Sequence, residues 1–150
     1  SYRDQLTQFG NRYAVDWFVE HEWNGEQIGV VYCDITGLKK VNDEQGHEAG
    51  DRLIIRACEC LAGVFKGYGL YRIGGDEFLV LCLGIEEKDL REHVEKLHMD
   101  MKEHQVTMAV GMIWKEHGPK DIDLLLNESE RLMYEDKDRY YKEHGLKRRR

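Results

Sequence analysis

Three carboxylates stand at positions where they could share a metal ion. Asp34 ends an apolar stretch, and Asp76 and Glu77 follow two glycines 42 and 43 residues further along the chain. Crowded carboxylates repel one another, and a hard divalent cation with oxygen ligands is the usual compensation. Two Mg²⁺ ions held in this way form a standard site for nucleotidyl transfer. Each feature alone is also ordinary turn chemistry, so the prediction depends on whether the fold brings the three together.

The elements predicted around these residues favour their convergence. Residues 28–35 form a continuous apolar run, typical of a strand buried on both faces, and residues 70–73 and 78–83 flank the two glycines as a hairpin. A helix over residues 50–65 joins the first strand to the second, so a right-handed crossover makes these two strands parallel. Parallel strands end at the same edge of a sheet, and Asp34 is therefore expected near the tip of the hairpin.

The remaining periodicities complete one α+β domain over residues 1–150. Apolar residues at helical spacing predict helices over residues 11–23, 90–101 and 122–140, and residues 106–114 favour a further strand. The central β-α-β-β-α-β order is the split pattern of ferredoxin-like folds. We therefore expect a mixed β-sheet with helices packed around it, and a polar loop over residues 42–51.

Composition excludes several classes of function. The 150 residues carry a formal net charge of −7, which argues against a nucleic-acid polymer as partner. The longest stretch without Asp, Glu, Lys or Arg, residues 104–114, is too short for a membrane span, and residues 1–5 open no signal peptide. We expect a cytoplasmic domain that makes no membrane contact of its own and ends in a basic tail over residues 146–150. The cysteines lack the spacing of a zinc or redox site and are expected as reduced, buried thiols: Cys33, Cys58, Cys60 and Cys82.

The segment after Asp34 could bind phosphate through its backbone. Gly37 permits close approach, so consecutive N–H groups there could cradle an anion. Spacing alone assigns Asp51 to a helix cap or first turn, and leaves Lys39 and Lys40 as solvated side chains.

Several stretches together resemble one known family. Residues 72–78 (RIGGDEF) resemble the signature hairpin of GGDEF-domain diguanylate cyclases, and residues 4–12 resemble the family's DxLT…NR opening. Residues 34–51, with DITGLK, VND, GH and GD, resemble its nucleotide-binding stretch. Val106, Thr107 and Gly111 resemble its late strand, and Tyr134 and Lys137 its last helix. Because the resemblance covers nearly the whole chain, it implies the palm-type, nucleotide-cyclase-like form of the predicted fold.

The resemblance implies synthesis of cyclic di-GMP from two GTP with release of two pyrophosphates. Each protomer of a homodimer would hold one GTP, with Mg²⁺ or Mn²⁺ as cofactor. Glu77 would either assist the metals or activate the attacking hydroxyl. The implied residues are Gly75, Asp76 and Glu77 for catalysis; Asp34, Ile35 (by its carbonyl), Asp76 and Glu77 for metal; Asn42 and Asp51 for guanine; Thr36, Gly37, Leu38 and Lys39 for the nucleotide; and Lys137 for terminal phosphates.

The chain departs from the family pattern at three places. Thr36 stands where many members have a second aspartate. Residues 65–68 (FKGY) replace the product-binding RxxD, so we expect no product inhibition through that site. Tyr141 stands where an arginine is expected, and Arg139 lies about 200° away around a helix.

Three other interpretations stay open. The chain could be a catalytically silent GTP-binding regulatory module, a cyclase with relaxed base choice, or a ferredoxin-like interaction domain without a nucleotide. Because the DxLT-like segment begins at residue 4, we expect a domain cut from a longer chain that carries an upstream sensor or dimerising domain. Whether that parent is tethered to a membrane is left open.

Overall fold

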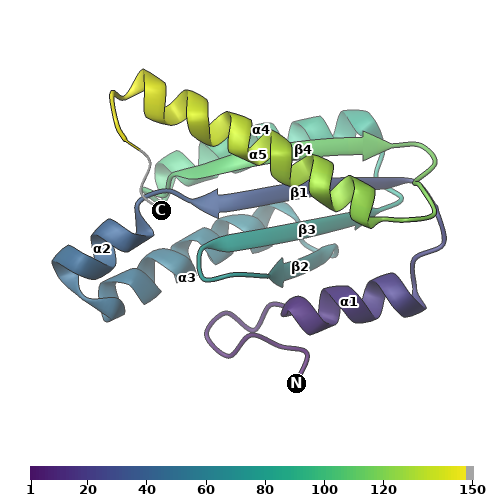
Figure 1. Ribbon diagram of the computed structural model, residues 1–150, viewed down its shortest axis with the longest axis horizontal. Helices are drawn as coiled ribbons and strands as arrows, with labels where there is room; N and C mark the ends of the chain where they lie inside the picture. The colour runs from purple at the N-terminus through teal and green to yellow at the C-terminus, as the bar shows by residue number, and fades with distance from the viewer. Residues whose placement is uncertain (148–150) are drawn as a thin grey trace.

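The computed structural model describes residues 1–147 and has a four-stranded sheet at its centre (Figure 1). The strands are β1 (Ile28–Ile35), β2 (Gly69–Arg72), β3 (Glu77–Leu83) and β4 (Met108–Lys115), in the order β2-β3-β1-β4. All three neighbouring pairs are antiparallel. The α+β, ferredoxin-like expectation is confirmed, and β1 and β2 run in the same direction as predicted. The expected mixed sheet is wrong, because β3 lies between those two strands and pairs antiparallel with each.

Helices cover both faces of the sheet (Figure 1). Alternate residues of β1 face opposite sides. Val31 and Cys33 pack with α3 (His47–Val64) and α4 (Glu87–Glu103), whereas Val30 and Tyr32 pack with α1 (Arg12–His21) and α5 (Asp123–Glu143). Every residue of β1 is buried, as the unbroken apolar run predicted.

The expected polar loop over residues 42–51 is wrong. A short helix, α2 (Leu38–Gln45), precedes α3, and the two are separated only by Gly46, whose φ of +91° lies in the region that favours glycine. Helix α2 buries no residue fully, and only Leu38 and Val41 pack against the core. With two apolar side chains in eight residues, the sequence pattern of α2 is too weak to separate from a loop.

The N-terminal segment extends the edge of the sheet next to β2. Gly10 N–H donates to the Leu70 carbonyl at 2.9 Å, and Arg72 N–H donates to the Gly10 carbonyl at 2.8 Å. A Cβ at Gly10 would lie 2.6 Å from the Tyr71 ring, so only glycine permits this approach. The segment before α1 is thereby fixed beside β2, the strand that leads into the turn over residues 74–77, called here the GGDE turn.

The other composition-based expectations concern thiols and membranes. The four cysteines are buried and free. Among residues 1–147, no helix is long and apolar enough to cross a membrane. Of the expected basic tail, residues 148–150 lie outside the described part of the chain.

Candidate active site

The GGDE turn is attached to the end of β1 by a backbone hydrogen bond. Ile35 N–H of β1 donates to the Asp76 carbonyl at 2.8 Å, and within the hairpin Ile73 N–H donates to the Glu77 carbonyl at 3.0 Å. Asp34 is the direct cross-strand partner of Glu77 in the β1–β3 register. The end of β1 therefore lies beside the GGDE turn, at the sheet edge predicted from topology.

Asp34 is a buried carboxylate with only one of its oxygens satisfied. It is 4% exposed, and its Oδ2 accepts from Lys137 Nζ of α5 at 2.8 Å. Its Oδ1 is buried and has no hydrogen-bond partner within the described residues. Burial, opposed by the Lys137 contact and reinforced by the charge of Asp76, raises the pKa of Asp34 to about 7. Lys137 thus supplies the only cationic partner that this carboxylate has among residues 1–147.

Glu77 is held on the α5 side of the sheet by a tyrosine. Tyr32 Oη lies 3.3 Å from Glu77 Oε2 and 3.0 Å from Glu130 Oε2. Burial and the charges of Asp76 and Glu130 raise the pKa of Glu77. Across residues 1–147, no three acidic, histidine or cysteine side chains are grouped closely enough to hold a metal. The expected three-carboxylate cluster is therefore not preformed, because Glu77 is engaged by Tyr32.

A cleft of about 410 Å³ opens beside Asp76 and contains most of the predicted nucleotide-binding residues. Four basic side chains border it, which gives an otherwise acidic protein a local site for anions. Tyr141 also lies on the wall, at the position where the family pattern has an arginine. The lining residues are Ile35, Thr36, Gly37, Leu38, Lys39, Lys40, Asp76, Lys137, Tyr141, Leu146 and Lys147.

The backbone at the cleft has the form that binds anions. Gly37 precedes α2 with φ of +82°, which turns the chain from β1 into the helix. The first N–H groups of a helix have no partner inside it and carry the positive end of its dipole. Helix α2 begins at Leu38, on the cleft wall, so its first N–H groups lie beside the cleft; phosphate binding by them stays a prediction.

The two predicted guanine-binding residues lie on neighbouring helices rather than on the cleft wall. Asn42 is in α2, and Asp51 is an exposed residue of α3. Gly50 lets the Asn42 side chain pack closely against α3, since a Cβ at Gly50 would overlap with Oδ1 of Asn42. Asp51 is the fifth residue of α3, beyond the cap or first turn to which spacing alone assigned it.

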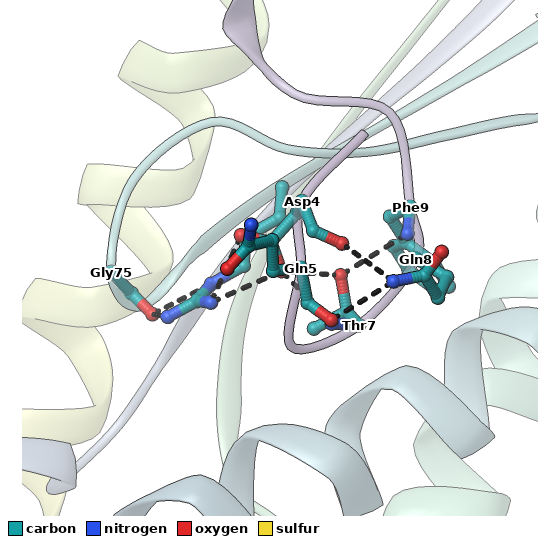
Figure 2. Close-up of polar contacts among 7 residues, drawn as sticks. Asp4, Gln5, Thr7, Gln8, Phe9 and Gly75 are labelled. Atoms are coloured by element: carbon teal, nitrogen blue, oxygen red, sulfur yellow. Dashed lines mark hydrogen bonds and ion pairs between the residues drawn. The ribbon is translucent and has the colours of Figure 1, made fainter. Parts of the chain in front are cut away.

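A second set of contacts holds the turn from the N-terminal side (Figure 2). The Arg72 guanidinium donates through Nη2 to the carbonyl of Gly75 at 2.8 Å and through Nη1 to both carboxylate oxygens of Asp4 at 3.2 Å. Asp4 also accepts from the N–H and the hydroxyl of Thr7, at 2.9 and 2.7 Å. The DxLT-like segment and the GGDE turn are therefore parts of one hydrogen-bonded unit.

Comparison with known proteins identifies the family to which this domain belongs. The family model described as "Diguanylate cyclase, GGDEF domain" matches residues 1–142. The chain belongs to this family. It is 30% identical over 152 residues to the diguanylate cyclase DgcP of Escherichia coli, covering 91% of this chain and 45% of DgcP. It is also 30% identical over 151 residues to the cyclic di-GMP phosphodiesterase PdeR of the same organism, covering 90% of this chain and 22% of PdeR.

Solved structures support the fold assignment. The crystal structure of the GGDEF domain of DgcB from Caulobacter crescentus, in complex with c-di-GMP, superposes with a TM-score of 0.78. The match covers 99% of this chain and 94% of that one at 20% identity, which shows the shared fold. This GGDEF domain spans less than half the length of DgcP or PdeR, so the same domain occurs within longer proteins named for opposite activities.

The chemistry of the donors at the sheet edge suits a hard cation. Asp34 Oδ1 is a buried carboxylate oxygen with no hydrogen-bond partner among residues 1–147, Asp76 lies close enough to influence the pKa of Asp34, and Ile35, whose carbonyl is a further oxygen donor, ends the same strand. These are oxygen ligands only, which Mg²⁺ and Mn²⁺ prefer. The residues present therefore fit such an ion, with Lys137 supplying the positive charge on the other oxygen of Asp34.

Sequence reasoning missed Tyr32 and Glu130. A signal for Tyr32 was present, because residues two apart in a strand share a face and Tyr32 precedes Asp34 by two. A buried tyrosine hydroxyl also requires a polar partner. Nothing in the sequence identified that partner as Glu130, since α5 is far along the chain and only the packing of α5 on β1 brings the two together.

Proposed function

We propose that this GGDEF domain is a diguanylate cyclase that condenses two GTP into cyclic di-GMP, with Mg²⁺ and across a homodimer. The observation that carries the proposal is the complete acidic turn beside the cleft, together with the buried Asp34 Oδ1, which has no hydrogen-bond partner in the described part of the chain. The basic cleft and the α2 N-terminus supply what a triphosphate requires.

Each residue group has a separate task in GTP binding. The first N–H groups of α2, with Lys39 and Lys137, hold the phosphates, and Lys137 exchanges part of its contact with Asp34 for phosphate oxygens. Asn42 and Asp51 bind the guanine edge, since a carboxylate can accept from both the ring N–H and the exocyclic amine. Asp34, Asp76 and the Ile35 carbonyl would hold the metal, which neutralises phosphate charge and stabilises the leaving oxygen when bound.

The reaction needs two copies of the chain because each copy holds one GTP. The 3′-hydroxyl oxygen of one GTP forms a bond to the α-phosphorus of the other, and the bond from that phosphorus to the β-phosphate oxygen breaks, releasing pyrophosphate. We assign the hydroxyl proton to a carboxylate oxygen of Glu77. The second bond forms in the same way with the roles exchanged. The protein's contribution is chiefly positioning and charge stabilisation.

The first experiment is to incubate the protein at high concentration with GTP and Mg²⁺ and to resolve the nucleotides by chromatography. We expect a cyclic di-GMP peak that EDTA abolishes. If this product is absent, the assay is repeated with the chain fused to a dimerising coiled coil, because an isolated domain can be inactive merely as a monomer. Absence of product in the dimerised protein contradicts the proposal.

The Asp76→Asn variant tests the acidic turn directly. Turnover is expected to fall by a factor on the order of 10³, because the change removes a carboxylate that would hold the metal ion at the reacting phosphates. The melting temperature should stay near that of the wild type, since the Asp76 carbonyl, not its side chain, bonds to Ile35. Asp16→Asn, an exposed position on α1, is the matched control and should retain full activity.

Gly50→Ala tests the guanine assignment without replacing either predicted guanine-binding side chain, Asn42 or Asp51. The added methyl overlaps with Asn42 Oδ1 and must displace that amide, so KM for GTP should rise about ten-fold or more with a smaller change in kcat. Alanine is the better helix former by about 1 kcal/mol, so the melting temperature should not fall. An unchanged KM for GTP in Gly50→Ala and in Asp51→Ala would mean that Asn42 and Asp51 have structural roles only.

A GTP-binding regulatory module without turnover is the second candidate. Tyr141 on the cleft wall favours it, because a tyrosine cannot replace the charge of an arginine at the terminal phosphates. Calorimetry with GTP and Mg²⁺ in the dimerised protein distinguishes the two. Heat of binding without product supports the regulatory module, and absence of both heat and product leaves the interaction domain.

A further inference from the structure

The contact between Tyr32 and two carboxylates is the part of the site that the GTP-binding assignments do not use. Tyr32 is 6% exposed, and its hydroxyl lies between Glu77 of β3 and Glu130 of α5, at 3.3 and 3.0 Å. Both glutamates are half-buried. Three elements distant in sequence thus meet at one hydroxyl group, two residues along β1 from Asp34.

One hydroxyl cannot donate to both carboxylates at once. A tyrosine O–H carries a single hydrogen, so Glu77 and Glu130 compete for it. A tyrosine hydroxyl is protonated at neutral pH, so Tyr32 remains a donor. The hydrogen is always present, and its direction is the only variable.

Stability alone does not account for the second carboxylate. A buried tyrosine hydroxyl is satisfied by one acceptor. Glu130 is a second acceptor on the same hydroxyl as Glu77, and two carboxylates held so close to one atom repel each other. A neutral acceptor on α5 would satisfy Tyr32 without that repulsion. The arrangement becomes useful if Glu77 has to leave Tyr32, because Glu130 then keeps the hydroxyl satisfied.

We propose that Tyr32 and Glu130 are positioning residues for Glu77. The Tyr32 hydroxyl holds Glu77 on the α5 face in the absence of substrate and turns to Glu130 when Glu77 moves toward the reacting hydroxyl. The repulsion from Glu130 favours that movement. The inference rests on the proposed cyclase activity for its kinetic consequence, but the contact with Glu77 can be tested without it.

The kinetic test compares three variants on the dimerised protein. Tyr32→Phe removes only the hydroxyl and should lower kcat about ten-fold while KM for GTP changes less than about two-fold. Glu130→Ala should produce a similar loss, and Glu130→Gln, which keeps an acceptor for Tyr32, should recover part of it. Glu128→Gln, on the exposed side of α5 where Glu128 pairs with Arg131, is the matched control and should behave as the wild type.

A spectroscopic readout separates this inference from the proposed function. The ¹³C carboxyl resonance of Glu77, assigned by its loss in Glu77→Gln, should shift in Tyr32→Phe and in Glu130→Gln but not in Glu128→Gln, at a single pH and without nucleotide. This measurement is valid even if the wild type makes no product. An unmoved resonance in Tyr32→Phe overturns the inference. A variant that raises KM for GTP and leaves kcat unchanged also overturns it.

Discussion

The GGDE turn is held from two sides, and the two sides differ in how completely their charges are satisfied. On the N-terminal side, Arg72 and Asp4 share two contacts, and each has further protein partners in Gly75 and Thr7. On the α5 side, Asp34 has one cationic partner and one buried oxygen without any hydrogen bond in the described chain.

This difference indicates which side is structural and which is available for ligands. Buried polar groups are nearly always satisfied, and an exception commonly marks a site for an ion or a catalytic group. The N-terminal side therefore fixes the turn, whereas the α5 side holds charge that a cation and phosphates can take over. Substitutions on the two sides should consequently respond differently to added Mg²⁺.

Lys137→Met is expected to have the largest effect on stability. It leaves Asp34 buried without its cation, which should lower the free energy of unfolding by about 2–3 kcal/mol. Millimolar Mg²⁺ should then raise the melting temperature of the variant more than that of the wild type, because the ion replaces Nζ at Asp34. The measurement is thermal unfolding with and without Mg²⁺.

Lys88→Met is the control for that measurement. Lys88 and Glu92 form an exposed pair at 3.9 Å, and such pairs contribute roughly 0–1 kcal/mol. The control should therefore match the wild type in stability and in its response to Mg²⁺. An equal Mg²⁺ response in Lys137→Met and in the control would mean that the α5 side is not a cation site.

Much of the sheet could be predicted from sequence. The unbroken apolar run of β1 predicted its burial and its bounds, and the two glycines located the hairpin. The crossover rule placed Asp34 at the correct edge although the order of the strands was not foreseen. These features depend on local pattern or on chain topology, which a single sequence contains.

The electrostatic state of the α5 side could not be predicted in the same way. Lys137 was expected to meet phosphate, yet it is bonded to Asp34, 103 residues away. Tyr32 and Glu130 are 98 residues apart and meet only because α5 packs across β1. Such contacts depend on how far a helix slides along a sheet, which neither hydrophobic periodicity nor spacing determines. Helix α2 was missed for another reason, the scarcity of apolar residues in it.

Arg72→Lys tests the N-terminal side and should have an intermediate effect. Lysine keeps the charge but cannot reproduce the fork that joins Gly75 to Asp4, so we expect a loss of about 1–2 kcal/mol in the free energy of unfolding. Added Mg²⁺ should restore none of it, in contrast to Lys137→Met. The comparison requires Arg131→Lys as control, whose exposed pairs with Glu128 and Glu135 should make the change nearly neutral.

The pH dependence of the Asp4 contacts should give the smallest effect. Partial burial raises the pKa of Asp4, but the hydrogen bonds from Thr7 and Arg72 outweigh it and hold the pKa below its usual 3.8. Because the folded pKa is depressed, the stabilisation is present above pH 3.8 and is lost as the pH falls through the folded value.

We therefore expect Asp4→Asn to lower the free energy of unfolding by about 1 kcal/mol at pH 7, and the difference from the wild type to shrink toward zero at the acid end of the titration. Denaturant unfolding of both proteins between pH 7 and pH 3 measures it. A difference that stays constant over this range would assign the loss to packing rather than to the charge of Asp4. In that case the charge of Asp4 would not contribute to holding the N-terminal segment against the GGDE turn.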